Sequence, residues 1–421
     1  MKTIRSFSIL LVLLSGILTS GYAEDPFHLD SLHTSRIRLN AGYLFASDAI
    51  TNQIAQTYFL AGFISEGMKD EVSKQLFQNN RFGGDAGYSL NYKNKIKSFF
   101  GKTGFSWFAG ISDQNHLHST FTKDAFELYF RGNAAYSGKQ ANLGPFDFSL
   151  IHYQQLNLGL QKEFRTGKSL IQFELGLSYN KGQKFQSIHS NRAELYTSVD
   201  GEYLDIDFDI ALRGSDSVSN DIGRFNGNGG SINFALNIIS EQKNEFSFRV
   251  HNFGFIQFNN QSYVVPADSN FRFEGIDASS LFNFSDTIST PVSSDSSFVQ
   301  SFLSDRKKEK YYYKLPAQIS ISYRKQMPDE ITSLTIGLDH TIFSSYLPHG
   351  WFRADRLIHK RHQAGIILGY GGYTLWQAGL SYSLNFCKSW IFTIQSPVLS
   401  GWLNRKSGRA QGAFVSLSKY L

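Results

Sequence analysis

The sequence predicts an all-β fold, a transmembrane antiparallel β-barrel of about fourteen strands with short N-terminal helices. Three observations lead to this prediction. Apolar and polar residues alternate with a period of two in many short segments. The composition is 15% aromatic and only 18% charged, whereas soluble domains carry about a quarter charged residues. Beyond the N-terminus, every apolar run is shorter than the ~20 residues of a membrane-spanning helix.

The alternation is clearest in LWQAGLSYSLNF, residues Leu375 to Phe386. From Trp376 onward every second residue is apolar or aromatic, and the residues between them are small or polar. A period of two indicates a strand with one apolar face and one polar face. The same pattern recurs in Leu150–Leu160, Ile171–Tyr179, Ile232–Ile238, Gln318–Arg324 and Leu334–Ile342.

Two architectures fit this alternation, and they differ in whether the polar strand faces point into or out of the fold. In a membrane barrel the apolar face contacts lipid and the polar face lines the interior. In soluble sandwiches the apolar face forms the core, and a chain of this length would divide into domains of about 100 residues joined by linkers. No Pro- or Gly-rich linker is evident, and Pro totals only 8. We therefore expect one continuous barrel, with a soluble periplasmic β-protein as the structural alternative.

Aromatic residues often lie at the ends of the predicted strands. Amphipathic rings prefer the headgroup level of a bilayer, so such residues form belts there. Core aromatics of a soluble β-protein are the alternative explanation. The residues concerned are Tyr88, Tyr92, Phe99, Phe100, Phe255, Phe258, Tyr311–Tyr313, Trp351, Phe352, Trp390, Phe392 and Trp402.

The first 23 residues have the pattern of a secretory signal peptide. A basic start precedes the apolar run Ser8–Leu18, and Gly21-Tyr22-Ala23 offers small residues where a signal peptidase cleaves. No Cys follows the run, which excludes a lipid anchor at that point. We expect cleavage after Ala23, export, and one outer-membrane β-barrel domain formed by residues 24–421.

Two regions do not have the pattern of strands. Residues 48–79 predict two short helices, capped by Asp48 and Ser65, and Lys123–Arg131 predicts a third. In a barrel the 48–79 segment would plug the lumen or cover its periplasmic mouth, or else pack as a surface helix on the rim. Residues 259–313 are rich in Ser and Asp, and predict a long polar extracellular loop. A disordered insertion is the alternative for that region.

Several short phrases recur in order along the chain: Asn80–Gly83, Phe130–Asn133, Tyr136–Gly138, Asn252–Ile256 and Phe273–Asp277. These phrases resemble an uncharacterised outer-membrane β-barrel family of Gram-negative bacteria, known as a domain of unknown function. The family is distantly similar to fatty-acid channels and to gliding-associated secretion barrels. The resemblance implies a barrel fold and an outer-membrane location, and it carries over no functional residue.

The sequence contains no constellation typical of an enzyme, so we expect no catalytic residues, no metal and no cofactor. His116-Leu117-His118 places two imidazoles on one strand face, but a closed metal site needs further ligands. A lipid hydrolase using His118 or Ser119 would contradict this expectation. The basic run His359–His362 is expected to be a solvated turn, with contact to lipid phosphate or lipopolysaccharide as the alternative.

These observations favour a channel or transport barrel for small or amphipathic molecules. The polar strand faces would line its lumen, with outer-membrane lipid and lipopolysaccharide as surroundings. The alternative is a non-transporting barrel that docks partners of an envelope secretion or assembly complex through its loops. The net charge of +6 is spread along the chain and indicates no nucleic-acid partner. The expected lumen-lining residues are Glu174, Arg324, Asp339, Gln377 and Ser381.

Overall fold

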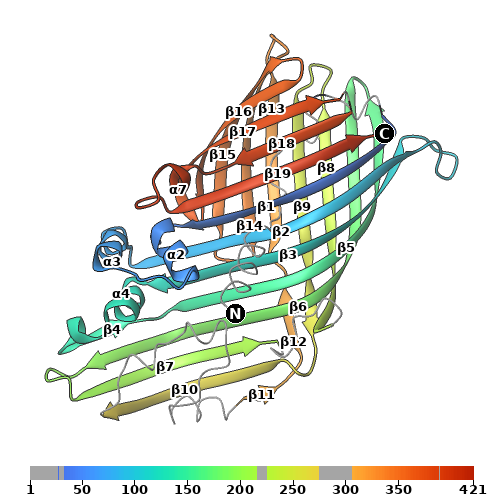
Figure 1. Ribbon diagram of the computed structural model, residues 1–421. Helices are drawn as coiled ribbons and strands as arrows, with labels where there is room; N and C mark the ends of the chain where they lie inside the picture. Colours follow the sequence, from blue (N-terminus) through green and yellow to red (C-terminus); the bar gives the residue numbers. More distant parts are fainter. Residues whose placement is uncertain (1–26, 28–32, 216–224, 275–305, 388) are drawn as a thin grey trace, which may run out of the picture.

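The structure is a computed structural model that describes residues 27, 33–215, 225–274, 306–387 and 389–421. Within this part of the chain, fourteen antiparallel strands close into one barrel, as the sequence predicts (Figure 1). The barrel strands, in ring order, are β1 (Ser35–Ser47), β2 (Asn79–Ile96), β3 (Phe105–Thr122), β5 (Phe146–Thr166), β6 (Ser169–Thr197), β8 (Gly227–Ile239), β9 (Glu245–Phe258), β13 (Ala317–Gln326), β14 (Thr332–Ile342), β15 (Leu347–His359), β16 (His362–Gly372), β17 (Thr374–Phe386), β18 (Trp390–Ser396) and β19 (Ala410–Tyr420).

The ring closes between its first and last strands. β1 pairs with β2 on one side and with β19 on the other, where the register runs from Arg36 opposite Tyr420 to Ala46 opposite Ala410. Closure removes the unpaired edges that an open sheet would present, and a sheet in lipid must close for this reason.

A smaller sheet extends from one side of the barrel. β6 is 29 residues long, and only its first half, up to Gly182, pairs with β8. From Gln186 onward it pairs instead with β7 (Tyr203–Gly214), which pairs in turn with β10 (Tyr263–Glu274) (Figure 1). Three short strands complete this region: β4 (Lys139–Asn142), β11 (Lys307–Lys308) and β12 (Tyr311–Lys314).

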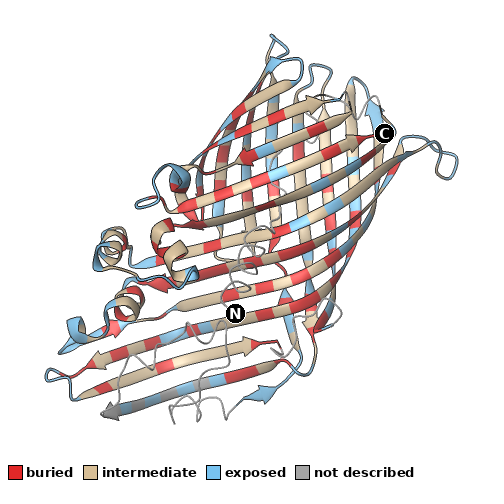
Figure 2. Ribbon diagram, viewed as in Figure 1, coloured by how far each residue is buried: buried red, intermediate tan, exposed pale blue. Residues whose placement is uncertain are grey.

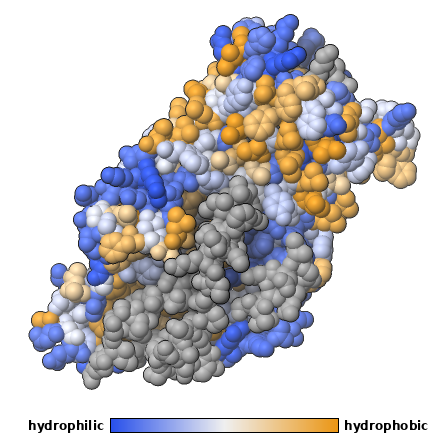
Figure 3. Space-filling view, in the orientation of Figure 1, coloured by the Kyte–Doolittle hydropathy of each residue, from blue (hydrophilic) through white to orange (hydrophobic). Residues whose placement is uncertain are grey.

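The apolar strand faces point outward and the polar faces point inward. On β17, Trp376 and Leu380 are 76% and 51% exposed, whereas Ser381 is 5% exposed. The other segments with period two show the same arrangement, which is visible as alternating burial along the strands (Figure 2). Hydrophobic residues gather over the barrel wall in Figure 3. This direction is the one expected of a membrane barrel and the reverse of a soluble sandwich.

The outward apolar band has the height of a bilayer core. On β17 it runs from Trp376, which packs edge-on against Tyr370, to Phe386, which stacks on Trp390. Ten residues at about 3.3 Å each, tilted by about 40°, span roughly 25 Å, the usual height of such a band. Aromatic pairs therefore lie near both ends of this band on β17. The belt prediction is wrong for Phe258, Tyr313 and Trp351, which are buried on the inner face, because alternation at strand ends does not fix which face a ring takes.

The connections at the two barrel ends differ in length. The end that holds Leu421 carries the tight connections 167–168, 327–331, 360–361 and 387–389, and we call it the short-turn end. The opposite end, the long-loop end, carries connections 48–78, 123–145 and 397–409. In outer-membrane barrels, periplasmic turns are short and extracellular loops are long.

The helices lie at the long-loop end (Figure 1). Phe121 and Phe126 pack against Ile54 and Val72 of the first two helices. No helix in the described part of the chain is long and apolar enough to cross a membrane. The helices are α2 (Asn52–Phe59), α3 (Glu66–Ser73), α4 (Lys123–Arg131), α7 (Ser400–Leu403) and the 3-10 turn η2 (Ala134–Tyr136).

Two predicted segments differ in detail from the structure. The 48–79 helices pack on the rim, and Thr51, not Asp48, caps the first by accepting a hydrogen bond from Ile54. The expected long loop 259–313 contains β10, β11 and β12, because its strand residues Tyr263–Glu274 pair with β7. Its Ser-rich part, residues 275–305, lies outside the described residues, as does the predicted signal peptide.

Candidate functional site

The barrel interior is lined by small and amide side chains from consecutive strands. They alternate with the lipid-facing residues, so each strand contributes to both surfaces. Buried polar residues of this inner face include Gln155, Ser178, Asn180, Asn233, Ser320, Asp339, Ser381 and Ser383.

Two of the cavities along this inner face are lined by residues that the structure describes. The short-turn cavity, of about 270 Å³, is bordered by Arg36, Lys93 and Ser418 among others. The long-loop cavity, of about 130 Å³, is bordered by residues such as His116 and Tyr346. Since a site of roughly 10–15 Å³ suffices for one water, each cavity has room for a hydrated small solute. Neither cavity is lined by a residue of α2 or α3.

A cluster of amide side chains includes two residues that border both cavities. We call it the amide cluster and define it as Gln114, Gln155, Asn180 and Asn252. Gln155 donates to Asn180 at 2.9 Å and to Asn252 at 3.0 Å, and Asn252 donates to Gln114 at 3.3 Å. Gln114 and Asn252, together with Arg353, border both cavities. Gln114, Asn252 and Arg353 therefore lie where the two cavities are closest to one another.

Asn252 reaches the amide cluster through an unusual backbone conformation. Its φ is +58°, and it lies where the register between β8 and β9 shifts, between Ile232 and Phe234. Asn tolerates this left-handed region better than other non-glycine residues. The irregularity turns the Asn252 side chain toward Gln155 of β5.

A row of carboxylates and imidazoles runs across β2, β3, β5 and β6. His116 lies 2.7 Å from Asp85 and 3.3 Å from His118. Asp147 in turn lies 3.3 Å from both His118 and His189. His116 and His118 are each 5% exposed. The sequence places the two histidines on one face, but only the strand register brings both carboxylates to them.

An apolar cluster faces the interior near the start of the side sheet. Phe185, Ile256, Phe258 and Leu315 are fully buried there. Tyr313 closes one edge of this cluster, and its hydroxyl lies 2.6 Å from the Ser149 hydroxyl. The interior thus combines polar cavities with one apolar wall.

The five predicted lining residues all lie on inner strand faces. Glu174 borders the short-turn cavity, and Asp339 and Gln377 border the long-loop cavity. Ser381 is buried and donates to Asp355 at 3.4 Å. Arg324 forms a 3.1 Å ion pair with Glu245 near the short-turn end and borders neither cavity.

Several basic residues of the interior were not predicted from the sequence. Arg36, Lys93 and Arg249 border the short-turn cavity, and each lies on the polar face of an alternating stretch of β1, β2 or β9. In Ser35–Ser47 the residues Arg-Ile-Arg-Leu-Asn alternate between polar and apolar side chains, so this pattern could have predicted Arg36 as a lining residue. No group of His, Cys, Asp and Glu suited to a metal ion occurs among the residues that the structure describes.

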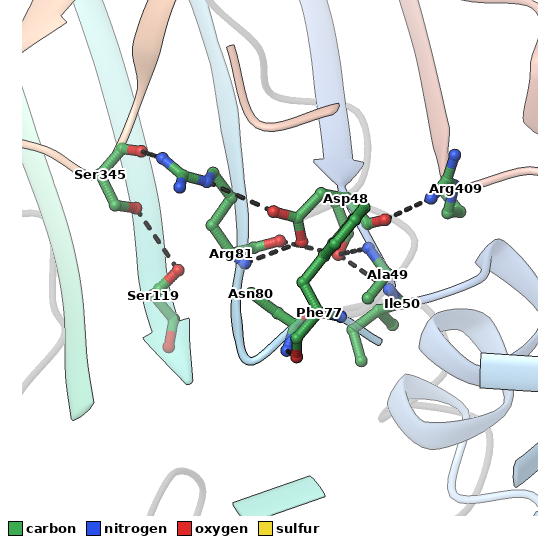
Figure 4. Close-up of polar contacts among 10 residues, drawn as sticks. Asp48, Ala49, Ile50, Phe77, Asn80, Arg81, Ser119, Ser345 and Arg409 are labelled. Atoms are coloured by element: carbon green, nitrogen blue, oxygen red, sulfur yellow. Dashed lines mark hydrogen bonds and ion pairs between the residues drawn. The ribbon is translucent and has the colours of Figure 1, made fainter. Parts of the chain in front are cut away.

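A polar node at the long-loop end ties the helices to the barrel rim (Figure 4). Arg81 donates its backbone N–H to the Asp48 carboxylate at 2.8 Å, and its guanidinium lies 3.3 Å from the same carboxylate. The guanidinium also donates to the Ser345 carbonyl at 3.3 Å, and Arg409 donates to the Asp48 carbonyl. Burial raises the pKa of Asp48, although its contacts with Arg81 act in the opposite direction.

A closed antiparallel barrel with an apolar outer belt and a polar interior defines an outer-membrane barrel with a channel-like fold. More specifically, this chain belongs to the family of unknown function DUF5723, which matches residues 50–393. The resemblance to an uncharacterised family is thus confirmed. No match was found among curated proteins.

Solved barrels resemble the chain at low sequence identity. The Pseudomonas putida toluene transporter TodX has a TM-score of 0.45 and 9% identity, covering 97% of this chain and 96% of its own. A Pseudomonas aeruginosa FadL homologue has a TM-score of 0.40 and 11% identity, with 91% and 89% covered. The translocator domain of NalP from Neisseria meningitidis has a TM-score of 0.33 and 8% identity, with 100% and 96% covered.

Proposed function

We propose that this protein is an outer-membrane channel for small or amphipathic molecules. The observation that carries the proposal is the pair of interior cavities that share Gln114, Asn252 and Arg353. Polar walls suit water and hydrated solutes, and the apolar cluster around Phe185 suits the hydrocarbon part of an amphipathic molecule.

The channel proposal is tested by conductance of the purified protein in planar bilayers. Wild-type protein is expected to conduct, and Gln114→Trp is expected to lower single-channel conductance because the larger ring enters the passage between the cavities. The matched control is Leu158→Trp, which changes a lipid-facing residue that is 54% exposed. Wild-type protein that folds in the bilayer but shows neither conductance nor solute uptake would contradict the proposal.

A second proposal is a non-transporting barrel that docks partners of an envelope complex. It is supported by large apolar side chains exposed around the rim helices, where Leu60 is 64% and Phe63 is 87% exposed. Photo-crosslinking from position 63 in intact cells tests it, with position 168 in the opposite turn as control. Crosslinks to one defined envelope protein would support docking, and crosslinks to lipopolysaccharide alone would contradict it.

A further inference from the structure

Aromatic side chains form part of the wall of the long-loop cavity. Tyr153, Tyr346, Trp351 and Phe414 are among its lining residues. The indole of Trp351 lies over Gly337 of the neighbouring strand β14, because a Cβ added at Gly337 would lie 2.4 Å from the ring. One face of the indole therefore covers Gly337, and the opposite face is turned toward the cavity that Trp351 borders.

Neutral amide groups border the same cavity. The Gln395 Oε1 accepts a hydrogen bond from Arg353 at 3.2 Å, and the Gln395 Nε2 has no partner among the residues that the structure describes. Gln114 donates one amide hydrogen to Ser112 at 2.9 Å, and Asn252 donates one to Gln114 at 3.3 Å. Since a side-chain amide carries two N–H hydrogens, Gln114 and Asn252 each retain a second donor. The cavity therefore offers several neutral donors to the oxygen atoms of a solute.

The aromatic face and the amide donors lie close together. Trp351 and Arg353 are two residues apart on the inner face of β15, and Arg353 reaches Gln395 of β18. The face of an aromatic ring carries partial negative charge, which attracts C–H bonds. A sugar ring combines C–H faces with hydroxyl groups around its edge, so this wall matches both kinds of surface on a sugar.

The charged side chains that border this cavity are already engaged by their neighbours. The Asp85 carboxylate lies 2.7 Å from His116, and the Arg353 guanidinium lies 2.6 Å from the Asp355 carboxylate. Asp339 accepts a 2.6 Å hydrogen bond from the hydroxyl of a serine on β13. A charged solute would compete with these contacts, whereas a neutral one leaves them intact. Because a carboxylate accepts several hydrogen bonds, Asp85 and Asp339 can also accept from hydroxyl groups.

The long-loop cavity has the size for one sugar ring. Its volume is about 130 Å³. At roughly 10–15 Å³ for one water, this volume corresponds to on the order of ten waters. A single pyranose ring displaces fewer waters than this, so it fits beside Trp351 and keeps part of its hydration.

We propose that the long-loop cavity binds a neutral sugar ring, and that the solutes of the channel are monosaccharides or short oligosaccharides. This inference rests on the proposed channel function and names the class of its solutes. Trp351 stacks on the face of the sugar, and Gln114, Asn252 and Gln395 donate hydrogen bonds to its hydroxyl oxygens.

The test is the ion current of the purified full-length protein in planar bilayers, with D-glucose added to the KCl solution. D-Glucose is expected to reduce the current saturably, whereas D-sorbitol, which has the hydroxyl groups but no ring, is expected to reduce it far less at equal concentration. Trp351→Leu is expected to raise the half-blocking concentration of D-glucose about fivefold, because the stacking face is lost. Trp376→Leu, at a lipid-facing position that is 76% exposed, is the matched control and is expected to leave this concentration unchanged.

The outcomes separate this inference from the channel proposal. Equal effects of the two solutes, or a glucose block that Trp351→Leu leaves unchanged, overturn the inference and leave the channel standing. Wild-type protein that folds but does not conduct overturns the channel proposal. Saturation-transfer NMR of that protein with D-glucose, in a detergent without a sugar headgroup, then decides the site: binding that Trp351→Leu weakens supports it, and no binding overturns it. Conductance of Trp351→Leu shows that it has folded, and Gln395→Leu, which removes a donor and is expected to weaken the block, replaces it if it has not.

Discussion

Asp48 shows how one carboxylate organises the rim of the barrel. Its side chain and carbonyl accept hydrogen bonds from Arg81 and Arg409, which belong to segments far apart in the chain. The residue follows β1 directly and is 5% exposed. Burial therefore raises the free energy of the ionised carboxylate, because the charge loses contact with water. The penalty disappears when the carboxyl is protonated, so it depends on pH.

The pH dependence of this site is predictable in sign. Because the pKa of Asp48 is raised above its usual value of about 3.8, the folded state binds a proton more readily than the unfolded state. The contribution of Asp48 to stability should therefore increase as pH falls from neutrality through the raised pKa. Unfolding midpoints in detergent at pH 7 and pH 4.5 check this. The advantage of wild type over Asp48→Asn should be larger at the lower pH, and a larger advantage at pH 7 would contradict it.

For single residues, the sequence predicts which face of a strand a side chain occupies better than it predicts which other residues that side chain contacts. The alternation in β17 places Gln377 and Ser381 on the inner face, and the structure agrees. The same reasoning cannot predict that Asn252 adopts a positive φ or that Asp85 meets His116. The first depends on an irregularity in the β8–β9 pairing and the second on the register between β2 and β3, and alternation within one strand fixes neither.

Among the elements, neighbouring strands accommodate large inward rings through glycine. Phe108 of β3 lies over Gly159 of β5 and Gly176 of β6, so that a Cβ added at Gly159 would lie 2.1 Å from the ring. The ring thus lies along the wall and borders the short-turn cavity without filling it. Tyr373 lies over Gly83 in the same manner.

Gly159→Val is expected to push the Phe108 ring into the short-turn cavity and to lower single-channel conductance. Gly230→Val is the control, because a Cβ there would meet only the Ser178 carbonyl at an ordinary 3.6 Å. Bilayer recordings of both variants check the prediction. Equal conductance of the two would show that the ring does not control the width of the lumen.

Beside the apolar packing of Phe126 on Val72, one guanidinium links helices α3 and α4. Arg131 lies 2.7 Å from Asp70, 3.3 Å from Glu66 and 2.8 Å from Glu127, and its hydrogen bond with Asp70 raises its pKa. Such part-exposed ion pairs contribute up to about 1 kcal/mol each. The helix Lys123–Arg131 has the bounds that the sequence predicts, whereas this contact with α3 could not be foreseen.

Replacing this guanidinium should loosen the helices without changing the barrel. Arg131→Gln is expected to speed amide hydrogen exchange in residues 66–73 by about fivefold, since about 1 kcal/mol of local stability is lost. Lys123→Gln in the same helix is the control. Exchange in β1 and β19 should stay as in wild type, and a change there would show that the helices support the wall.

The whole molecule is organised by the direction of its apolar faces. Leu177 points outward and is 63% exposed, whereas its neighbour Ser178 points inward and is 6% exposed. The sequence predicts this fold because each of many strands repeats the same alternation. It does not predict the side sheet, because β6 changes its pairing partner midway, from β8 to β7, next to a register shift at Gln183 that only the strand pairing reveals.

The membrane assignment predicts an energetic difference between two exposed positions. Leu177→Arg is expected to destabilise the barrel in lipid vesicles by about 2–4 kcal/mol, because it places a charge in the acyl region. Val199→Arg, at a connection beyond the band and 70% exposed, should be nearly neutral. Urea unfolding in vesicles measures both, and equal tolerance of the two charges would contradict the assignment.

The pairing of β1 with β19 has a consequence for biogenesis. These partners lie at opposite ends of the described chain, so the wall cannot be sealed before the last strand has been delivered. Until then both terminal strands display unsatisfied backbone groups that recruit other chains. Sealing is thus a late step with a large loop-closure cost, and a polypeptide lacking β19 should accumulate as an aggregate instead of inserting.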